Sequence, residues 1–356
     1  MVYSATRYTL KDGAHFSREF IIMLLAVFLG IIAALFLSYF DYQVYTKFWP
    51  VIAVFCVIIM LVLFKWGTGP SSRPDARTWL SIGPINFQPS ELVKIGFIIT
   101  FGVHLDKVKE KINNIFSILQ LGAHAAVPIV LVAATGDMGS ALVFMVIAIV
   151  MMFVAGVHWG YFLGGIALVG AATPLIWTYV LKQLQKDRFL ALIYPDLYPD
   201  IIYQQQRGLN AIGAGGITGQ GLFKGAYTQA GAVPESQNDM IFSVVGEEFG
   251  FIGCITALLL IVLITVRIIY VGKKSSEQST NLICTGMAAM IIGQMIINVG
   301  MCLMLLPVIG ITLPFFSAGG SSNLCVYLGI GIVMSIYRHN CDTGAVNIRV
   351  YDSLKK

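Results

Sequence analysis

Charged residues are scarce in this chain of 356 residues: lysine, arginine, aspartate and glutamate together make up 12% of it. Hydrophobic residues make up 57%, and the mean hydropathy is +0.80. One soluble core could not bury that much apolar surface, so the composition excludes an ordinary globular protein. The chain is predicted to lie in a lipid bilayer.

Cysteine is also sparse and follows no pattern. The six cysteines fall in apolar runs or in the C-terminal tail, at Cys56, Cys254, Cys284, Cys302, Cys325 and Cys341. No Cys-x-x-Cys pair and no Cys/His spacing occurs, which argues against a disulfide framework and a structural zinc site. The net charge of +5 is typical of loops that face anionic lipid, and it does not indicate a nucleic-acid partner.

Long apolar runs dominate the chain and predict an all-α polytopic membrane protein. The first run begins after Arg18 and is long enough to span the membrane rather than to be cleaved as a signal peptide. Nine spans are expected, at about 19–40, 49–65, 90–105, 115–133, 138–156, 159–181, 242–271, 281–305 and 321–337. Since nine is odd, the two ends should lie on opposite sides of the membrane. We expect one transmembrane domain over 1–338 and a cytoplasmic tail over 339–356.

Basic clusters orient the spans. Lysines and arginines gather after the third span, after the seventh span and at the C-terminus, and such clusters mark the cytoplasmic side. The loops at 66–88, 134–138, 182–241 and 306–320 are then predicted to face outward. The basic residues that this orientation leaves outside are Arg7, Lys11, Arg18, Arg73 and Arg77.

The longest polar stretch, 182–241, is the segment most suited to function, because a loop of this size is usually functional or disordered. It keeps leucine, isoleucine, phenylalanine and tyrosine throughout, which favours folding. Residues 211–225 contain six glycines among apolar residues, a pattern that predicts close packing or a re-entrant or amphipathic segment. The Pro/Gly/Ser-rich stretch 306–322 is predicted to line the outer mouth of the bundle.

Asp239 is the leading catalytic candidate, because it stands where the long outer loop enters the seventh span. A carboxylate there would be partly dehydrated yet open to a membrane-bound substrate, which suits a general base. The alternative is an N-cap for the following helix, a role that Asn238 could share.

Other carboxylates near the spans also require an explanation, because charge at membrane depth is costly. Glu247 and Glu248 follow one and two turns into the helix after Asp239, where a buried pair satisfied by arginine or backbone donors is the structural alternative. Glu91 and Lys94 are three residues apart on one helical face, a spacing that favours an ion pair. Asp137 is either a helix cap or an outward-facing polar contact.

Four cations occupy the predicted outer loops: Arg77, Arg188, Arg207 and Lys224. Such groups could hold a phosphate or diphosphate. Solvated loop charges and contacts to lipid head groups are the alternatives.

Long motifs in a fixed order resemble the SEDS family (shape, elongation, division and sporulation), and within it the RodA group most closely. The resemblance runs from about residue 2 to 338 and rests on RTWLSIGPINFQPSELVK (77–94), TGDMGSA (135–141), AIGAGGITGQGL (211–222), PESQNDMIFSVVGEEFGFIG (234–253) and LPVIGITLPFFSAGGSS (306–322). Several long matches in the right order make it specific.

The resemblance implies a glycosyltransferase that polymerises lipid II into peptidoglycan at the outer face of the bacterial cytoplasmic membrane. It implies a class B penicillin-binding protein and other elongation or division machinery as partners. The essential carboxylate of the family's P-E-x-x-T-D-F motif falls on Asp239, with Pro234 and Glu235 beside it. The E-E-x-G motif falls on Glu247 and Glu248.

The remaining family motifs map onto earlier positions. Q-P-S-E-x-x-K falls on Glu91 and Lys94, and the aspartate of D-x-G-[TS] falls on Asp137. Arg77 and Arg188 match basic positions and are the choices for offsetting charge on a leaving diphosphate. A divalent cation, Mg²⁺ or Mn²⁺, is the other candidate for that role, and no organic cofactor is expected.

The mechanism that the resemblance implies is an inverting displacement. A sugar 4-hydroxyl attacks the anomeric carbon of an α-linked diphosphate, giving a β-1,4 bond, while Asp239 accepts the hydroxyl proton. Competing functions are a lipid II flippase and a non-catalytic scaffold for the penicillin-binding partner.

The sequence departs from the family pattern near the candidate base. Asn238 and Met240 replace the usual Thr and Phe, Arg207 and Gly208 replace Gln-Ser, and Gln220 replaces a frequent Lys. These changes bear on efficiency or acceptor choice.

The family has ten spans, and the motif alignment places Met1 at the outer end of the first of them. A truncated start or a misassigned initiation codon is the expectation that follows, and it would explain why Arg7, Lys11 and Arg18 appear outside.

Overall fold

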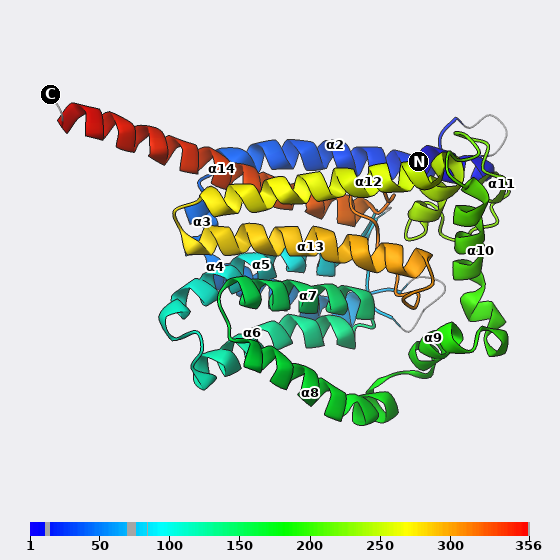
Figure 1. The fold of residues 1–356 in the computed structure, drawn as a ribbon, viewed down its shortest axis with the longest axis horizontal. Helices are drawn as coiled ribbons and strands as arrows, with labels where there is room; N and C mark the ends of the chain where they lie inside the picture. Colours follow the sequence, from blue (N-terminus) through cyan, green and yellow to red (C-terminus); the bar gives the residue numbers. More distant parts are fainter. Residues whose placement is uncertain (11–14, 70–75, 84, 355–356) are drawn as a thin grey trace. The chain divides into compact units, whose positions relative to one another are not determined.

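The computed structural model describes residues 1–10, 15–69, 76–83 and 85–354, and nearly all of its regular structure is helical (Figure 1). The predicted all-α membrane fold is confirmed. Lys11 and Arg73, two of the basic residues that the orientation leaves outside, lie beyond the described residues.

Each expected span coincides with a helix. These helices are α2 (Arg18–Tyr39), α4 (Trp49–Trp66), α5 (Pro89–Lys107), α6 (Ile115–Ala134), α7 (Met138–Val154), α8 (Trp159–Leu175), α12 (Ile241–Lys274), α13 (Gln278–Cys302) and α14 (Gly320–Leu354). In the described part of the chain, seven helices are long and apolar enough to cross a membrane. The other two are α7, with 17 residues, and α5, which carries four charged residues. The count of nine spans therefore stays a prediction.

Short elements connect the long helices. They are α1 (Val2–Thr6), η1 (Arg7–Thr9), α3 (Tyr42–Lys47), β1 (Leu80–Ile82), β2 (Ile85–Phe87), η2 (Lys109–Lys111) and η3 (Ile176–Val180), a π-helical continuation of α8. The two strands form an antiparallel hairpin in which Leu80 pairs with Phe87.

The long polar stretch is folded rather than extended. It contains α9 (Gln183–Ile193), η4 (Pro195–Leu197), α10 (Pro199–Gly215) and α11 (Ala226–Gln229), drawn in green in Figure 1. Helix α10 is amphipathic, because its buried residues recur every three or four positions, at Ile202, Gln205, Gly208, Ala211 and Gly215. The predicted tail after residue 338 is also helical, because α14 continues to Leu354.

The Gly-rich segment packs closely on a kink in α12. Gly250 has a φ of +65° inside that helix, a conformation that glycine adopts without a steric penalty. The kink leaves backbone groups that the Gly-rich segment satisfies: Phe251 N donates to Gly216 O at 2.9 Å, and Gln220 N donates to Glu247 O at 2.9 Å. A side chain at Gly219 or Gly250 would collide with the opposite backbone. Of the predicted alternatives, close packing is therefore observed.

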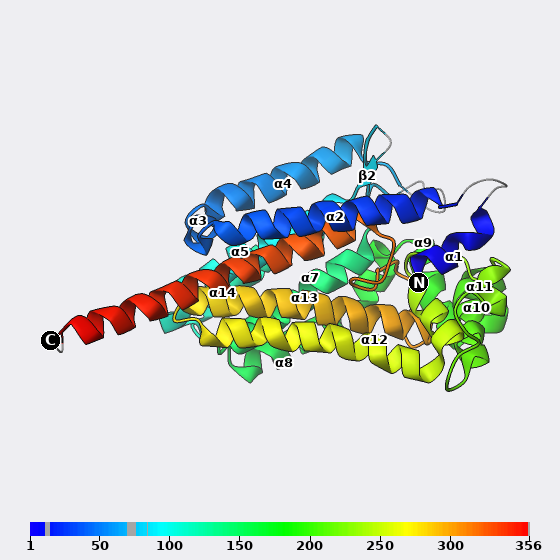
Figure 2. The ribbon, with the colours of Figure 1, turned by 90° about the horizontal axis from the view of Figure 1, so that it is seen from above.

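The chain divides into two compact units. The first comprises Met1–Leu24, His158–Val262 and Gly293–Gly319, and the second comprises Leu25–Val157, Leu263–Ile292 and the chain from Gly320 onward. In the second unit, α5 packs against α4, α6 and α7 (Figures 1 and 2).

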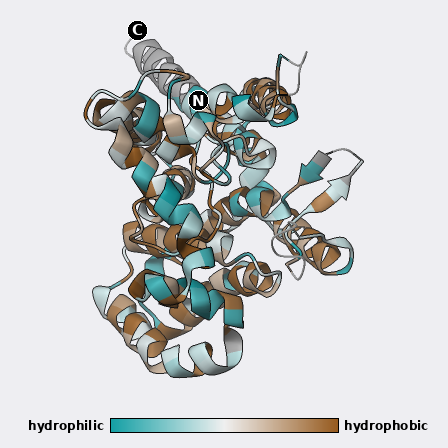
Figure 3. Cartoon of the chain, turned by 90° about the vertical axis from the view of Figure 1, so that its right-hand side faces the viewer, coloured by the Kyte–Doolittle hydropathy of each residue, from teal (hydrophilic) through white to brown (hydrophobic). Residues whose placement is uncertain are grey.

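Hydrophobic residues make up much of the long helices, drawn in brown in Figure 3. The most apolar window of α8 has none of its residues buried, and in α4 only 11% are buried. Exposed apolar helices of this length are stable in lipid and not in water. The chain is thus a multi-pass membrane protein.

Candidate active site

Asp239 lies in a turn two residues before α12 begins, in the first unit. It is 9% exposed, and its Oδ1 accepts a hydrogen bond of 3.4 Å from Gln204 Nε2 of α10. The carboxylate is therefore close to the positively polarised end of a helix, which stabilises negative charge. That position suits both a capping group and a proton acceptor, so the two predicted roles stay open.

The turn that carries Asp239 is held by its own backbone. Glu235 has a φ of +53°, and its carbonyl accepts from Asn238 N at 3.0 Å and Met240 N at 3.2 Å. Its carboxylate accepts from Asn238 Nδ2 at 2.7 Å. The asparagine that departs from the family pattern thus has a local function, since its amide ties the two acidic positions of the motif into one turn.

Helix α13 and the stretch 306–320 also bind the backbone of the Asp239 turn. Asn298 of α13 donates to the carbonyl of Asp239 at 2.7 Å and to Ile311 O at 2.7 Å. Ser317 Oγ donates to Asn238 O at 2.6 Å, and Ala318 N donates to Gln237 O at 2.8 Å. The stretch 306–320 therefore contacts the Asp239 turn directly.

Helix α10 approaches α12 closely at Gly208. A β-carbon at Gly208 would lie 2.8 Å from Ser243 Oγ and 3.3 Å from Met240 Cε. The departures at 208 and 240 are therefore neighbours in space, and glycine at 208 is what permits the approach. Arg207, the adjacent departure, lies over the ring of Tyr203 at 5.2 Å.

Glu247 and Glu248 bind the outer loop and the N-terminal segment rather than an arginine. Glu247 is fully buried and accepts from Tyr227 N at 2.6 Å, from Thr228 N at 2.9 Å and from Thr228 Oγ1 at 2.6 Å. Glu248 Oε1 accepts from Ser4 Oγ at 2.5 Å and from Gln229 Nε2 at 3.3 Å. The backbone donors to Glu247 match the structural alternative, whereas Glu248 accepts from side chains that this alternative did not include.

Arg188 anchors α9 in the same unit. Its Nη1 donates to Val308 O at 2.7 Å, which ties the start of the outer loop to the stretch 306–320. A guanidinium carries five N–H groups, so this contact is compatible with binding an anion as well.

The other predicted residues lie in the second unit. Glu91 and Lys94 form the predicted ion pair, with 2.8 Å between Oε1 and Nζ, and Lys94 is fully buried. Asp137 caps α7 by accepting from Ser140 N at 3.0 Å, and its Oδ2 accepts from Ser90 Oγ at 3.0 Å. It therefore serves as the predicted cap and as a polar contact to α5.

Arg77 is exposed and makes two backbone contacts in the second unit. Its Nη1 donates to Phe64 O at the end of α4, and its backbone N donates to Thr135 O at 2.8 Å. These contacts connect the 66–88 loop to the C-terminal ends of α4 and α6.

Among the described residues, no group of three or more His, Cys, Asp or Glu side chains could hold a metal ion. A cation carried by substrate phosphates needs only one or two carboxylates, and Asp239 is a donor of that kind.

The residues of the sequence motifs thus have defined positions in the structure, and a comparison with known protein families identifies the family of the chain. The model of the FtsW, RodA and SpoVE family, described as cell cycle proteins, matches residues 1–342. The chain belongs to this family.

Named relatives agree. The chain is 28% identical over 314 residues to the peptidoglycan glycosyltransferase MrdB of Escherichia coli, covering 87% of this chain and 83% of the relative. It is 31% identical to the stage V sporulation protein E of Bacillus subtilis over 355 residues, covering 96% and 93%. A solved chain described under "Structural coordination of polymerization and crosslinking by a peptidoglycan synthase complex" superposes with a TM-score of 0.80 at 25% identity, covering 95% of each chain.

Three polar partners of the family's acidic turn were not predicted: Gln204, Asn298 and Ser317. Each lies in a different segment from Asp239, and Asn298 and Ser317 stand among apolar or glycine residues. For Asn298 the available signal was a polar side chain at membrane depth, which is costly unless it is paired. Gln204 lies in a run of three glutamines, which gave no such signal.

Proposed function

We propose that this chain is a peptidoglycan glycosyltransferase that polymerises lipid II into β-1,4-linked strands at the outer face of the bacterial cytoplasmic membrane. The observation that carries the proposal is a nearly buried carboxylate, Asp239, in a turn that three separate segments hold at the start of a membrane helix. The relatives named peptidoglycan glycosyltransferases support the reaction class.

An apolar groove in the same unit supports a lipid-linked substrate. The groove has a volume of about 620 Å³ and is formed mainly by α12, together with Leu222 of the Gly-rich segment and Phe316. Phe316 is adjacent to Ser317, which binds the Asp239 turn. A polyprenyl chain in this groove would bring its diphosphate-linked sugar to the level of the carboxylate.

In the proposed reaction, the 4-hydroxyl oxygen of one lipid-linked sugar attacks the anomeric carbon of another. The hydroxyl proton passes to the Asp239 carboxylate, a new C–O bond forms, and the bond to the diphosphate breaks with inversion. Undecaprenyl diphosphate leaves with the bonding electrons. Because a diphosphate is already a good leaving group, the protein contributes mainly positioning and charge stabilisation.

Supporting roles are proposed for the remaining residues. Gln204 and Glu235 orient the carboxylate and its turn. Glu247 and Glu248 fix the outer loop. Arg188, which lies in the same unit as Asp239, is the proposed contact for the diphosphate. Arg77, Glu91, Lys94 and Asp137 are proposed to shape the second unit, and Mg²⁺ or Mn²⁺ remains the proposed counter-ion.

The proposed partner is a class B penicillin-binding protein, as the description of the peptidoglycan synthase complex suggests. In this arrangement the outer loop and the Asp239 turn lie outside, and the C-terminal tail lies in the cytoplasm. Roles in cell shape, elongation or division follow from the family.

The test is polymerisation of labelled lipid II by the reconstituted protein and its partner, with products resolved on a gel. Asp239→Asn should reduce the rate by about 10²–10⁴-fold, the usual contribution of a general base. The matched control is Asp196→Asn, an exposed aspartate of η4 in the same unit, which should polymerise like wild type. Equal ladders from wild type and Asp239→Asn would refute the assignment of the base. Absence of any ladder from the folded, partner-bound wild type would favour the scaffold or flippase function.

A further inference from the structure

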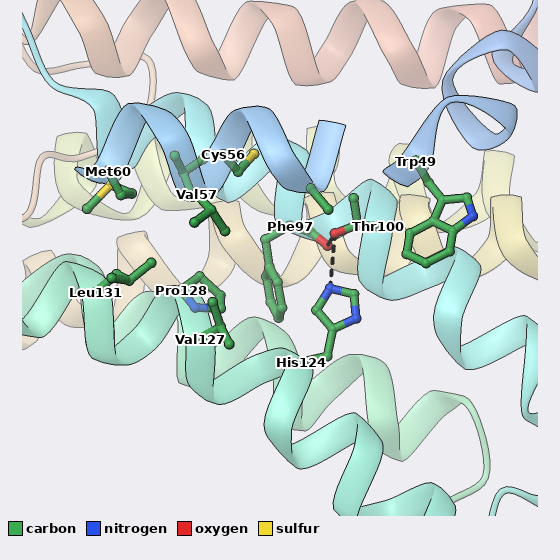
Figure 4. Close-up of a pocket in the computed structure, with 12 residues that line it drawn as sticks. Trp49, Cys56, Val57, Met60, Phe97, Thr100, His124, Val127, Pro128 and Leu131 are labelled. Atoms are coloured by element: carbon green, nitrogen blue, oxygen red, sulfur yellow. Dashed lines mark hydrogen bonds between the residues drawn. The ribbon is translucent and has the colours of Figure 1, made fainter. Parts of the chain in front are cut away.

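A cavity in the second unit is separate from the Asp239 turn and its supporting residues. It lies between α4 and α6, with α5 as its floor, and has a volume of about 240 Å³ (Figure 4). Most of its wall is apolar, with Val57 and Met60 from α4, Phe97 from α5, and Val127 and Leu131 from α6. Val127 is 48% exposed, so the cavity borders the lipid-facing surface.

One end of the cavity is polar. His124 Nε2 lies 3.2 Å from Thr100 Oγ1, and His124 Nδ1 lies 2.9 Å from His104 Nδ1. Figure 4 shows Trp49 at the same end as His124, whereas Met60 and Leu131 lie at the opposite end. The cavity is therefore amphipathic along its length, as a site for a molecule with one polar end would be.

A missing backbone donor adds to this polarity. Pro128 lies inside α6 and has no N–H, so the carbonyl of His124, four residues earlier, lacks its usual helical partner. Both residues line the cavity. The α6 wall of the cavity therefore carries a backbone acceptor beside the His124 ring.

A positive charge stands at the polar end. Lys107 Nζ lies 4.4 Å from the centre of the Trp49 ring, and Lys107 follows His104 by one turn of α5. Lys109 is paired with Asp106 at 3.0 Å, whereas Lys107 has no ion-pair partner among the described residues and is exposed. Tryptophan and lysine side by side are typical of the membrane interface, and basic groups beside a gap between membrane helices bind acidic lipid head groups.

We propose that this cavity binds an anionic phospholipid, with part of one acyl chain between α4 and α6 and the phosphate at Lys107 and Trp49. At about 30 Å³ for each water-sized group, the volume has room for about eight such groups, which is part of one chain. The charge pattern of the loops predicts that this end of α5 is cytoplasmic, where anionic lipids are abundant. The site is thus at the opposite end of α4, α5 and α6 from the outer loops predicted at 66–88 and 134–138, and it does not depend on the proposed reaction.

The experiment is a lipid titration of the full-length protein in detergent, followed by native mass spectrometry. Phosphatidylglycerol and phosphatidylcholine with identical chains are compared, because they differ in net charge and not in their apolar part. Two variants disrupt the site: Lys107→Gln removes the charge, and Ala53→Phe fills the cavity from α4. Their matched controls are Lys109→Gln, two residues away, and Ala126→Phe, on the exposed face of α6 outside the cavity.

Wild type should bind the first phosphatidylglycerol more tightly than phosphatidylcholine. Lys107→Gln should weaken phosphatidylglycerol binding by about fivefold and leave phosphatidylcholine unchanged, the effect expected for one basic residue near a membrane surface. Ala53→Phe should weaken both lipids, and both controls should bind like wild type.

Equal affinity of wild type for the two lipids would overturn the proposal. An effect of Lys107→Gln without any effect of Ala53→Phe would also overturn it, because the chain would then not occupy the cavity. Thermal unfolding without added lipid verifies that each variant is folded. Val127→Trp, at the exposed rim, replaces Ala53→Phe if that variant does not fold.

Discussion

We predict that the Glu247 carboxylate holds the outer loop against α12. Glu247→Gln tests this contact with the smallest change in side-chain shape. Its carboxylate accepts two backbone N–H groups and the Thr228 hydroxyl, at 2.6 to 2.9 Å, and all three partners are donors. An amide retains one acceptor oxygen and turns an NH₂ group toward the remaining donors.

The magnitude follows from these contacts. Hydrogen bonds to charged groups contribute about 1.5–3 kcal/mol each, so losing about half of three such bonds costs about 2–5 kcal/mol. A neutral amide is less costly to bury than a carboxylate, which offsets part of that loss. A net cost of about 3 kcal/mol corresponds to a roughly 100-fold increase in the open population of the segment around α11.

Hydrogen–deuterium exchange measures this opening directly. In the Glu247→Gln variant, the protection factors of peptides that cover residues 222–232 should fall by roughly 100-fold if this segment opens locally. Glu235→Gln is the matched control, because its carboxylate contacts Asn238 and not α11. A change of less than about threefold in the 222–232 peptides would refute the reasoning, since the three contacts would then contribute little.

Two further predictions concern buried packing. Lys94→Met should lower the stability measured by thermal unfolding in detergent by about 3–5 kcal/mol, because Glu91 keeps an uncompensated buried charge. Adding Glu91→Gln should restore most of the loss, and a double variant as unstable as the single one would contradict the ion-pair explanation. Gly215→Ala should destabilise the protein because its β-carbon would collide with Gly246 O, whereas Gly213→Ala, with open space around it, should be neutral or stabilising by up to about 1 kcal/mol. Equal melting temperatures for the two alanine variants would contradict this account of how α10 packs.

Local sequence rules predicted the features that depend on neighbours along the chain. Apart from α14, which continues to Leu354, the helices begin and end within a few residues of the expected spans, because apolar runs of membrane length have few alternatives to a helix. The spacing of Glu91 and Lys94 predicted their ion pair, and Asp137 had the residue type and position of a helix cap. The family resemblance is confirmed over residues 1–342, and its motifs distinguish Asp239 from the other carboxylates.

Contacts between distant segments were decided by the tertiary structure alone. Glu248 and Ser4 are 244 positions apart, and Asp239 and Gln204 are 35 apart, so no periodicity connects them. In the sequence, Gly219 is one of several glycines in a loop and Gly250 is a glycine in an apolar run, yet the two permit one close backbone approach. Helical periodicity determines which face of a segment is apolar, whereas the partner of a buried polar group depends on how segments far apart in the chain pack together.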